Sequence, residues 1–175
     1  MLPELLIAYA SRAGSTAEVA EALGAGLREA GLLVEVQPIS EVESVRGWKA
    51  LIVGAPLYCG RFPGDFHKFL ARHRDALEIL HPWCFVLGPT KAEARLFESA
   101  RAEAEKELAK HPWLPLRELH VFGGKWDPRT IPFPFSLVKL VPANPVGKIP
   151  ASDVRDWAAI RAWAHAIARQ VKSAA

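Results

Sequence analysis

Several features of well-known protein classes are missing from this sequence. Only two of its 175 residues are cysteine, and Cys59 and Cys84 form neither a C-x-x-C pair nor a zinc-finger pattern with histidine. No apolar run approaches the roughly 20 residues that span a membrane. The N-terminus has neither a basic start nor a cleavage site, so we expect no signal peptide. The scarcity of cysteine favours a reducing, cytoplasmic location.

Two common phosphate-binding motifs are also missing. A Walker loop requires a lysine before its serine or threonine, and the hydroxyl-rich stretch near the N-terminus has none. A dinucleotide-binding fingerprint requires three glycines, and that stretch contains only Gly14. The sequence therefore predicts neither a P-loop nucleotide hydrolase nor a Rossmann dehydrogenase.

The composition is that of a folded, mildly basic chain. Half of the residues are hydrophobic and 23% are charged, so residues 1–175 are expected to form a single domain with a real core. The net charge is +3, but lysine and arginine are spread along the helices and mixed with glutamate, so we expect no nucleic-acid partner. A basic surface suits an anionic partner or an anionic membrane face.

The stretch Leu5–Thr16 indicates a binding site for phosphate. A short apolar run, typical of a buried strand, ends in small and hydroxylated residues, and an amphipathic helix follows at once. Ser15 and Glu18 fit a capping box, and the N–H groups at a helix start attract anions. The alternative is an ordinary polar turn with a good N-cap. The candidate phosphate contacts are Ser11, Arg12, Ala13, Gly14, Ser15 and Thr16.

The rest of the chain alternates between strand and helix patterns. Strands are expected at 33–39, where apolar residues alternate, and at 50–55, 83–88 and 116–122. The continuous apolar run at 50–55 is typical of a parallel strand covered on both faces. Helices are expected from about residue 65 toward 80, after 91, and from Ser152 or Asp153 onward. This alternation predicts a doubly wound, three-layer α/β domain.

The segment 125–150 interrupts this rhythm. It contains six prolines and an apolar patch at 131–141, and connections of this length are usually functional. Two interpretations stay open: an element that faces substrate or membrane, or a cover packed on the sheet edge.

The phosphate-binding stretch resembles the FMN phosphate loop of flavodoxins, and the resemblance extends over nearly the whole chain. Within that superfamily it is most similar to the menaquinone-dependent protoporphyrinogen oxidases. The resemblance rests on Tyr9–Thr16, on Gly54–Phe62, and on Asp156-Trp157 with Trp163-Ala164. It implies a flavodoxin-like αβα sandwich with a five-stranded parallel sheet in the order 2-1-3-4-5, and it implies FMN as cofactor.

In such a sheet the loops after strands one, three and four meet at one crevice. The second loop offers Pro56, Leu57, Tyr58, Cys59 and Gly60, with Tyr58 stacking on the flavin and Gly60 supplying a positive φ. Alternatively, Tyr58 lies on its own loop, and Cys59 is interpreted as a small apolar filler. The third loop offers Gly88, Pro89 and Thr90, and Gly124 and Trp126 are further candidate neighbours of the cofactor.

The resemblance implies an FMN-dependent oxidoreductase that passes electrons to a quinone-type acceptor, with a porphyrinogen-like substrate. Contact between 126–142 and the inner face of the membrane is one interpretation of that segment, and packing on the fold is the other. Two alternatives stay open: an electron carrier that docks on redox partner proteins, and a flavodoxin-fold module without cofactor. Flavin carries the chemistry in such proteins, so no catalytic residue or metal site is expected. The six histidines are interpreted as surface or capping residues: His67, His73, His81, His111, His120 and His165. The tryptophans other than Trp126 are interpreted as packing residues: Trp48, Trp83, Trp113, Trp157 and Trp163.

Overall fold

A parallel five-stranded sheet forms the centre of the structure, a computed structural model that describes residues 4–130 and 150–174. The strand order is β2-β1-β3-β4-β5, which confirms the expected order 2-1-3-4-5. β3 and β4 are buried along their whole length, whereas the edge strand β2 is half-buried, as its alternating pattern predicts. The strands are β1 (Leu5–Tyr9), β2 (Val34–Pro38), β3 (Ala50–Pro56), β4 (Trp83–Leu87) and β5 (Glu118–Phe122).

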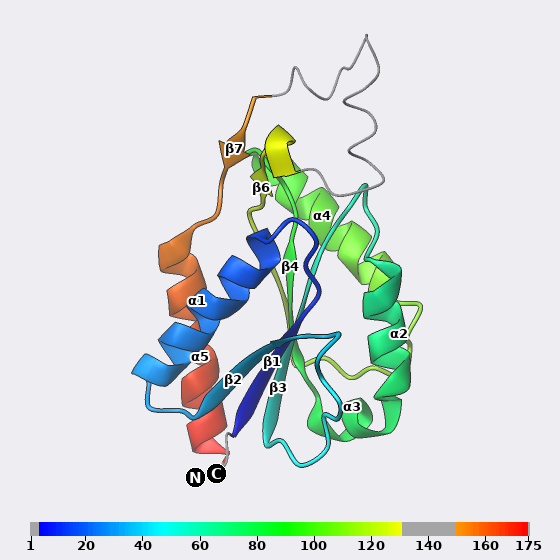
Figure 1. Cartoon of the computed structure of the whole chain (residues 1–175), viewed down its shortest axis with the longest axis vertical. Coiled ribbons are helices and arrows are strands. Elements are labelled where there is room, and N and C mark those ends of the chain that lie inside the picture. The colour runs from blue at the N-terminus through cyan, green and yellow to red at the C-terminus, as the bar shows by residue number, and fades with distance from the viewer. Residues whose placement is uncertain (1–3, 131–149, 175) are drawn as a thin grey trace.

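Helices cover both faces of the sheet and complete the three layers (Figure 1). Alternate residues of β1 point to opposite faces, so Leu5 and Ile7 pack with α1 and α5, and Leu6 and Ala8 pack with α2 and α3. The helices are α1 (Ser15–Glu29), α2 (Gly64–Arg72), α3 (Arg74–Leu80), α4 (Ala94–Leu108) and α5 (Trp157–Ser173).

The start of α1 differs from the sequence prediction. Gly14, in a left-handed conformation with φ 88°, is the N-cap, and no side chain caps the helix. The predicted capping box is therefore wrong: Ser15 is already helical, and the Glu18 carboxylate pairs with Arg155 at 2.7 Å. Arg155 lies 137 positions away in the sequence, so local spacing does not reveal that it, and not the helix start, binds the Glu18 carboxylate.

The segment after β5 forms a small two-stranded ribbon. β6 (Lys125–Trp126) pairs antiparallel with β7 (Ser152–Asp153), and the short 3-10 helix η1 (Pro128–Thr130) follows β6. The prediction that a helix begins at Ser152 or Asp153 is wrong, because both residues pair with β6. The apolar patch 131–141, and with it most of the expected membrane contact 126–142, lies outside the described residues.

α5 begins instead at Trp157, and the N-cap is Asp156, whose side chain accepts a hydrogen bond from the Ala159 N–H at 3.0 Å. Trp157 is 44% exposed, so its interpretation as a packing residue is wrong, and the Arg155 guanidinium lies 4.5 Å from the centre of its ring. The other four tryptophans interpreted as packing residues do contact the core, namely Trp48, Trp83, Trp113 and Trp163.

Arg155 links the ribbon to α1. Its side chain is 2% exposed and donates to Asp153 at 2.6 Å and to Glu18 at 2.7 Å. Lys125 of β6 lies 3.5 Å from the same Glu18 carboxylate. A buried guanidinium is tolerated only when carboxylates pair with it, so these ion pairs fix the ribbon beside the first turn of α1.

Candidate functional site

At the carboxyl edge of the sheet, each segment that follows β1, β3, β4 or β5 is hydrogen-bonded to the end of a neighbouring strand or to the segment after it. The Ala10 N–H, after β1, donates to the Gly54 carbonyl at 2.8 Å, and the Leu57 N–H, after β3, donates to the Leu87 carbonyl at 2.9 Å. The remaining two bonds run from the Gly88 N–H to the Phe122 carbonyl, at 3.1 Å, and from the Gly124 N–H to the Pro89 carbonyl, at 2.7 Å. The segments expected to form the site therefore leave the sheet side by side at the same edge.

The first of these segments, 11–16, presents unused hydrogen-bond donors. The Ser11 hydroxyl accepts from the Gly14 N–H at 3.1 Å and closes the turn, and the first intrahelical bond runs from the Glu18 N–H to the Gly14 carbonyl at 3.0 Å. The N–H groups of residues 15–17 precede that bond, so helix geometry leaves them without a helical acceptor, and no side chain caps them. Such a set of amides at the positive end of α1 suits an anion.

The side chains of this segment differ in access. Ser11 and Ser15 are half-buried and Arg12 is exposed, whereas Thr16 is 1% exposed. A ligand at the helix start can therefore reach the hydroxyl of Ser15 more easily than that of Thr16.

The second segment, which we name the β3 loop (57–62), contains a tight turn. Tyr58 and Arg61 exchange two backbone hydrogen bonds, at 2.9 and 3.1 Å, around Cys59 at φ 49° and Gly60 at φ 75°. The expected positive φ at Gly60 is thus observed, and two successive positive φ values are typical of a hairpin-type turn. Cys59 is exposed at this turn, so its interpretation as a small apolar filler is wrong.

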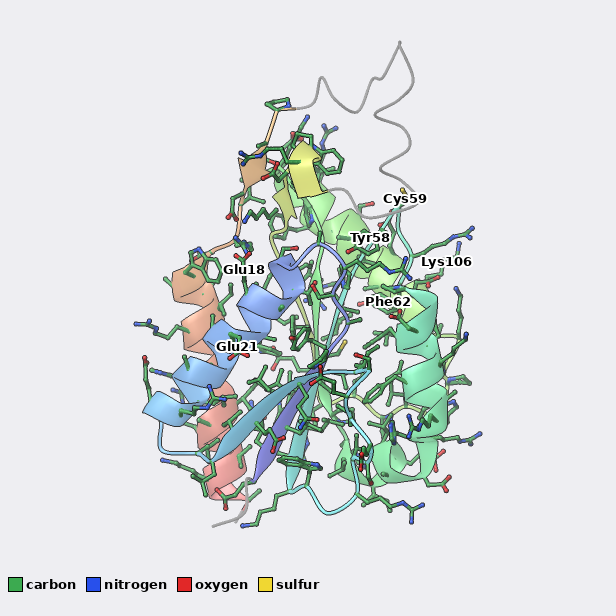
Figure 2. The ribbon with its side chains drawn as sticks, in the orientation of Figure 1. Glu18, Glu21, Tyr58, Cys59, Phe62 and Lys106 are labelled. Atoms are coloured by element: carbon green, nitrogen blue, oxygen red, sulfur yellow. The ribbon has the colours of Figure 1, made fainter. Side chains whose placement is uncertain are left out.

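Tyr58 reaches from the β3 loop toward the first segment. Burial raises the pKa of its phenol, and this is opposed by the Arg12 guanidinium and by the backbone N–H groups of Arg12 and Ala13, which lie close enough to lower the pKa. Figure 2 shows Tyr58 on the loop between α1 and α4. The ring therefore lies between the two segments expected to hold the phosphate and the flavin, rather than only against its own loop.

A cavity of about 300 Å³ opens between the β3 loop, the segment after β4 and α4. Five expected site residues line it, and the sequence reasoning missed the four that α4 contributes. The sequence gives little indication of these four residues, because only Leu96 and Ala100 belong to the apolar stripe of α4. The lining residues are Leu57, Gly60, Gly88, Pro89, Thr90, Leu96, Ser99, Ala100 and Glu103.

Gly124 and Trp126, the two further residues expected near the cofactor, do not line this cavity. A Cβ on Gly124 would lie 2.8 Å from the Gly88 carbonyl oxygen, so this glycine permits the close approach of two segments. Trp126 is half-buried in β6, and its indole N–H is buried without a hydrogen-bond partner among the described residues.

A cluster of titratable groups adjoins the end of the β3 loop. Glu107 of α4 accepts from the Phe62 N–H at 3.1 Å, its other carboxylate oxygen contacts Lys110, and His67 Nε2 lies 2.9 Å away. His67 Nδ1 lies 2.8 Å from Nε2 of His111, so these two half-buried histidines contact each other and do not stand singly on the surface. Burial raises the pKa of Glu107, but the hydrogen bonds from Lys110, His67 and the Phe62 N–H outweigh it and hold the pKa at about 2.

Within residues 4–130 and 150–174, no group of three or more histidine, cysteine, aspartate or glutamate side chains could hold a metal ion. No helix in those ranges is long and apolar enough to cross a membrane.

Comparison with known proteins gives consistent matches. The flavodoxin domain family matches residues 6–133. Over 141 residues the chain is 26% identical to protoporphyrinogen IX dehydrogenase [quinone] of Escherichia coli (strain K12), covering 78% of this chain and 77% of that protein. A flavodoxin from the domain Archaea has a TM-score of 0.58 at 15% identity, covering 96% of this chain and 98% of that one. A cysteine-to-serine mutant of flavodoxin from Pseudomonas aeruginosa has a TM-score of 0.57 at 16% identity, with the same coverage. At such identities the two structures show a shared fold.

Proposed function

Because this chain belongs to the flavodoxin domain family, whose cofactor is FMN, we propose that it is an oxidoreductase that passes electrons through the flavin to a quinone-type acceptor. The observation that carries this proposal is the convergence of the β3 loop, the segment after β4 and the uncapped start of α1 at one edge of the sheet. The family membership itself establishes flavin-based redox chemistry, and the acceptor and the substrate are the proposed part.

The donor set at the start of α1 fits the phosphate of FMN. The N–H groups of residues 15–17 and the hydroxyl of Ser15 would hold the phosphate oxygens, with Arg12 as the nearby cation. Ser11 contributes indirectly, because its hydroxyl fixes the Gly14 N–H and so shapes the turn.

The ring of the flavin would lie at the β3 loop. The cavity beside that loop is mostly apolar, and the Thr90 and Ser99 hydroxyls and the Glu103 carboxylate are the polar side chains in its wall. Tyr58 supplies an aromatic face beside the first segment, and the exposed turn at Cys59 and Gly60 leaves backbone groups accessible. When bound, FMN accepts and donates one or two electrons, and these residues orient it and exclude water.

The proposed substrate is a porphyrinogen, and its support is the 26% identical relative, whose name specifies protoporphyrinogen IX and a quinone. The net charge of +3 is consistent with this proposal, because a porphyrinogen carries anionic carboxylates. Acidic surfaces, which suit soluble electron shuttles, are not a feature of this composition.

The test is an anaerobic assay of the FMN-loaded protein with protoporphyrinogen IX and a soluble naphthoquinone, followed by porphyrin fluorescence. We expect porphyrin to form only when both FMN and the quinone are present, and protein stripped of FMN is the control. A protein that binds FMN but forms no porphyrin would contradict the proposed substrate. In that case rapid one-electron reduction of cytochrome c by the reduced protein would favour the electron-carrier alternative.

A further inference from the structure

α4 contacts the β3 loop at two positions that are one helical turn apart. A Cβ placed on Gly60 would lie 3.0 Å from the carboxyl carbon of Glu103, so this side chain lies directly against the turn. Four residues along the same face, Glu107 accepts a hydrogen bond from the Phe62 N–H at the end of the loop. Glu103 also lines the cavity, whereas Glu107 does not. The second carboxylate therefore contacts the loop without contacting the space that a ligand would fill.

The Glu107 carboxylate is itself held in place. The residue is 5% exposed, and both of its oxygens are hydrogen-bonded, one to Lys110 and the other to His67 and the Phe62 N–H. The His67 ring stacks on His111 with 5.1 Å between ring centres and bonds to it through Nδ1. The carboxylate cannot rotate away from the loop without leaving buried polar groups unpaired, which is costly.

The opposite end of the β3 loop is fixed by a different element. The Leu57 N–H donates to the Leu87 carbonyl of β4, and the turn between Tyr58 and Arg61 closes on itself. Phe62 lies between this turn and the start of α2, and its backbone N–H is held by the Glu107 carboxylate of α4. The shape of the loop thus depends on β4 at one end and on Glu107 at the other.

We propose that Glu107 is a positioning residue for the flavin: it fixes the β3 loop through the Phe62 N–H, with His67 and His111 holding the carboxylate in place. This inference rests on the proposed function, because it assigns the loop to the flavin ring. The competing explanation is that Glu107 only joins α2 to α4 and stabilises the fold.

The test compares Glu107→Ala with Glu107→Gln in otherwise unchanged protein, by titration with FMN and with riboflavin. Because riboflavin lacks the phosphate, a defect in the β3 loop weakens both ligands equally and leaves the ratio of their dissociation constants unchanged. We expect Glu107→Ala to weaken each about tenfold, the effect of one charge-assisted hydrogen bond. In Glu107→Gln the amide oxygen can accept from both the Phe62 N–H and the His67 Nε2–H, and the NH2 group takes the place of the oxygen that contacts Lys110. Glu107→Gln is therefore expected to restore both affinities to within about twofold of the original.

Glu105→Ala is the matched control, because Glu105 lies on the exposed face of α4 and its carboxylate lies 3.9 Å from Arg101 of the same helix. It is expected to leave both affinities and the visible circular dichroism of the bound flavin unchanged, whereas Glu107→Ala alters that spectrum. If Glu107→Ala fails to fold, His67→Ala keeps the carboxylate but removes its support, and a twofold to threefold loss for both flavins is expected.

Unchanged flavin affinities in Glu107→Ala, together with a lowered melting temperature, would overturn the proposal in favour of the purely structural explanation. A loss confined to FMN would overturn it too, since it would place the defect at the phosphate. Hydrogen exchange at the Phe62 amide, measured without flavin, is expected to be faster in Glu107→Ala than in Glu105→Ala. That readout still reports on the loop if the proposed function itself fails and no flavin binds.

Discussion

At the scale of single residues, the space around one glycine sets the width of the candidate site. Gly88 lies where the segment after β4 passes between α4 and β5. A Cβ added there would lie 2.8 Å from the Cβ of Ala100 and 3.3 Å from Cγ1 of Val121. Contacts this short force a neighbour to move, and Ala100 is also part of the cavity wall. The absence of a side chain at position 88 therefore lets α4 lie close to the sheet.

We predict that Gly88→Ala lowers the free energy of unfolding by about 1–3 kcal/mol, because the added methyl group overpacks this contact. Gly64→Ala is the control: Gly64 begins α2 and has no atom within 4 Å of the added Cβ, so its effect is expected to be within about 0.5 kcal/mol. Urea denaturation of the two variants measures the difference. Equal stabilities would show that the position tolerates a side chain.

At the scale of elements, the ribbon of β6 and β7 depends on one buried side chain. The two strands contain only two residues each, which is too short for independent stability. Arg155 joins β7 to the first turn of α1 through Asp153 and Glu18, so the ribbon and the start of α1 share their main electrostatic contact.

We predict that Arg155→Met destabilises the protein by about 1–2 kcal/mol, because it removes the charge-assisted hydrogen bonds that join β7 to α1, while the two remaining carboxylates are 41% and 48% exposed and stay hydrated. Arg161→Met is the control, since Arg161 is 66% exposed and its carboxylate partner Glu29 is 3.9 Å away. Exposed pairs of this kind contribute about 0–1 kcal/mol. Thermal unfolding of both variants separates the two cases, and a similar small loss in each would show that the link is not needed.

At the scale of the whole molecule, the candidate site connects the two helical layers. Its first segment leads into α1, which packs on one face of the sheet, and its cavity is walled by α4, which packs on the other (Figure 1). A ligand bound to both parts would connect the layers, and binding to the native state alone raises the stability of the entire fold.

We predict that FMN raises the melting temperature more than riboflavin does at equal concentration, because only FMN has the phosphate that the start of α1 would bind. At a free ligand concentration of 100 times Kd, the expected stabilisation is about 2.7 kcal/mol. Ser15→Ala is expected to reduce the shift for FMN and to leave the riboflavin shift unchanged. Equal shifts for the two ligands in the unchanged protein would contradict the phosphate assignment.

Much of this architecture follows from local sequence patterns. The continuous apolar run of β3 and the alternation in β2 specify a central and an edge strand because burial on two faces or one dictates the pattern. Gly31, just after the C-cap Ala30 of α1, has a φ of 83°, a conformation that favours glycine and that is typical of the residue following a helix.

The errors in the predictions concern contacts between residues distant in sequence. The sequence predicts Glu18 to be a capping residue, but in the structure its carboxylate pairs with Arg155. It predicts His67 to be a surface or capping residue, but the His67 ring contacts Glu107 and His111. No periodicity or spacing encodes such partners. The four residues that α4 adds to the cavity were missed for the same reason.

The packing of α5 against α1 has a consequence for the order in which the protein is made. Gly26 of α1 faces Ala164 of α5 so closely that a Cβ on the glycine would lie 3.0 Å from that of the alanine, and both residues are buried. A ribosome releases α1 before α5, so the apolar face of α1 and the side chains of Leu5 and Ile7 lack part of their cover while the elements between the two helices are translated. The nascent chain is therefore open to aggregation and to chaperones on this face until α5 packs there and closes that half of the core.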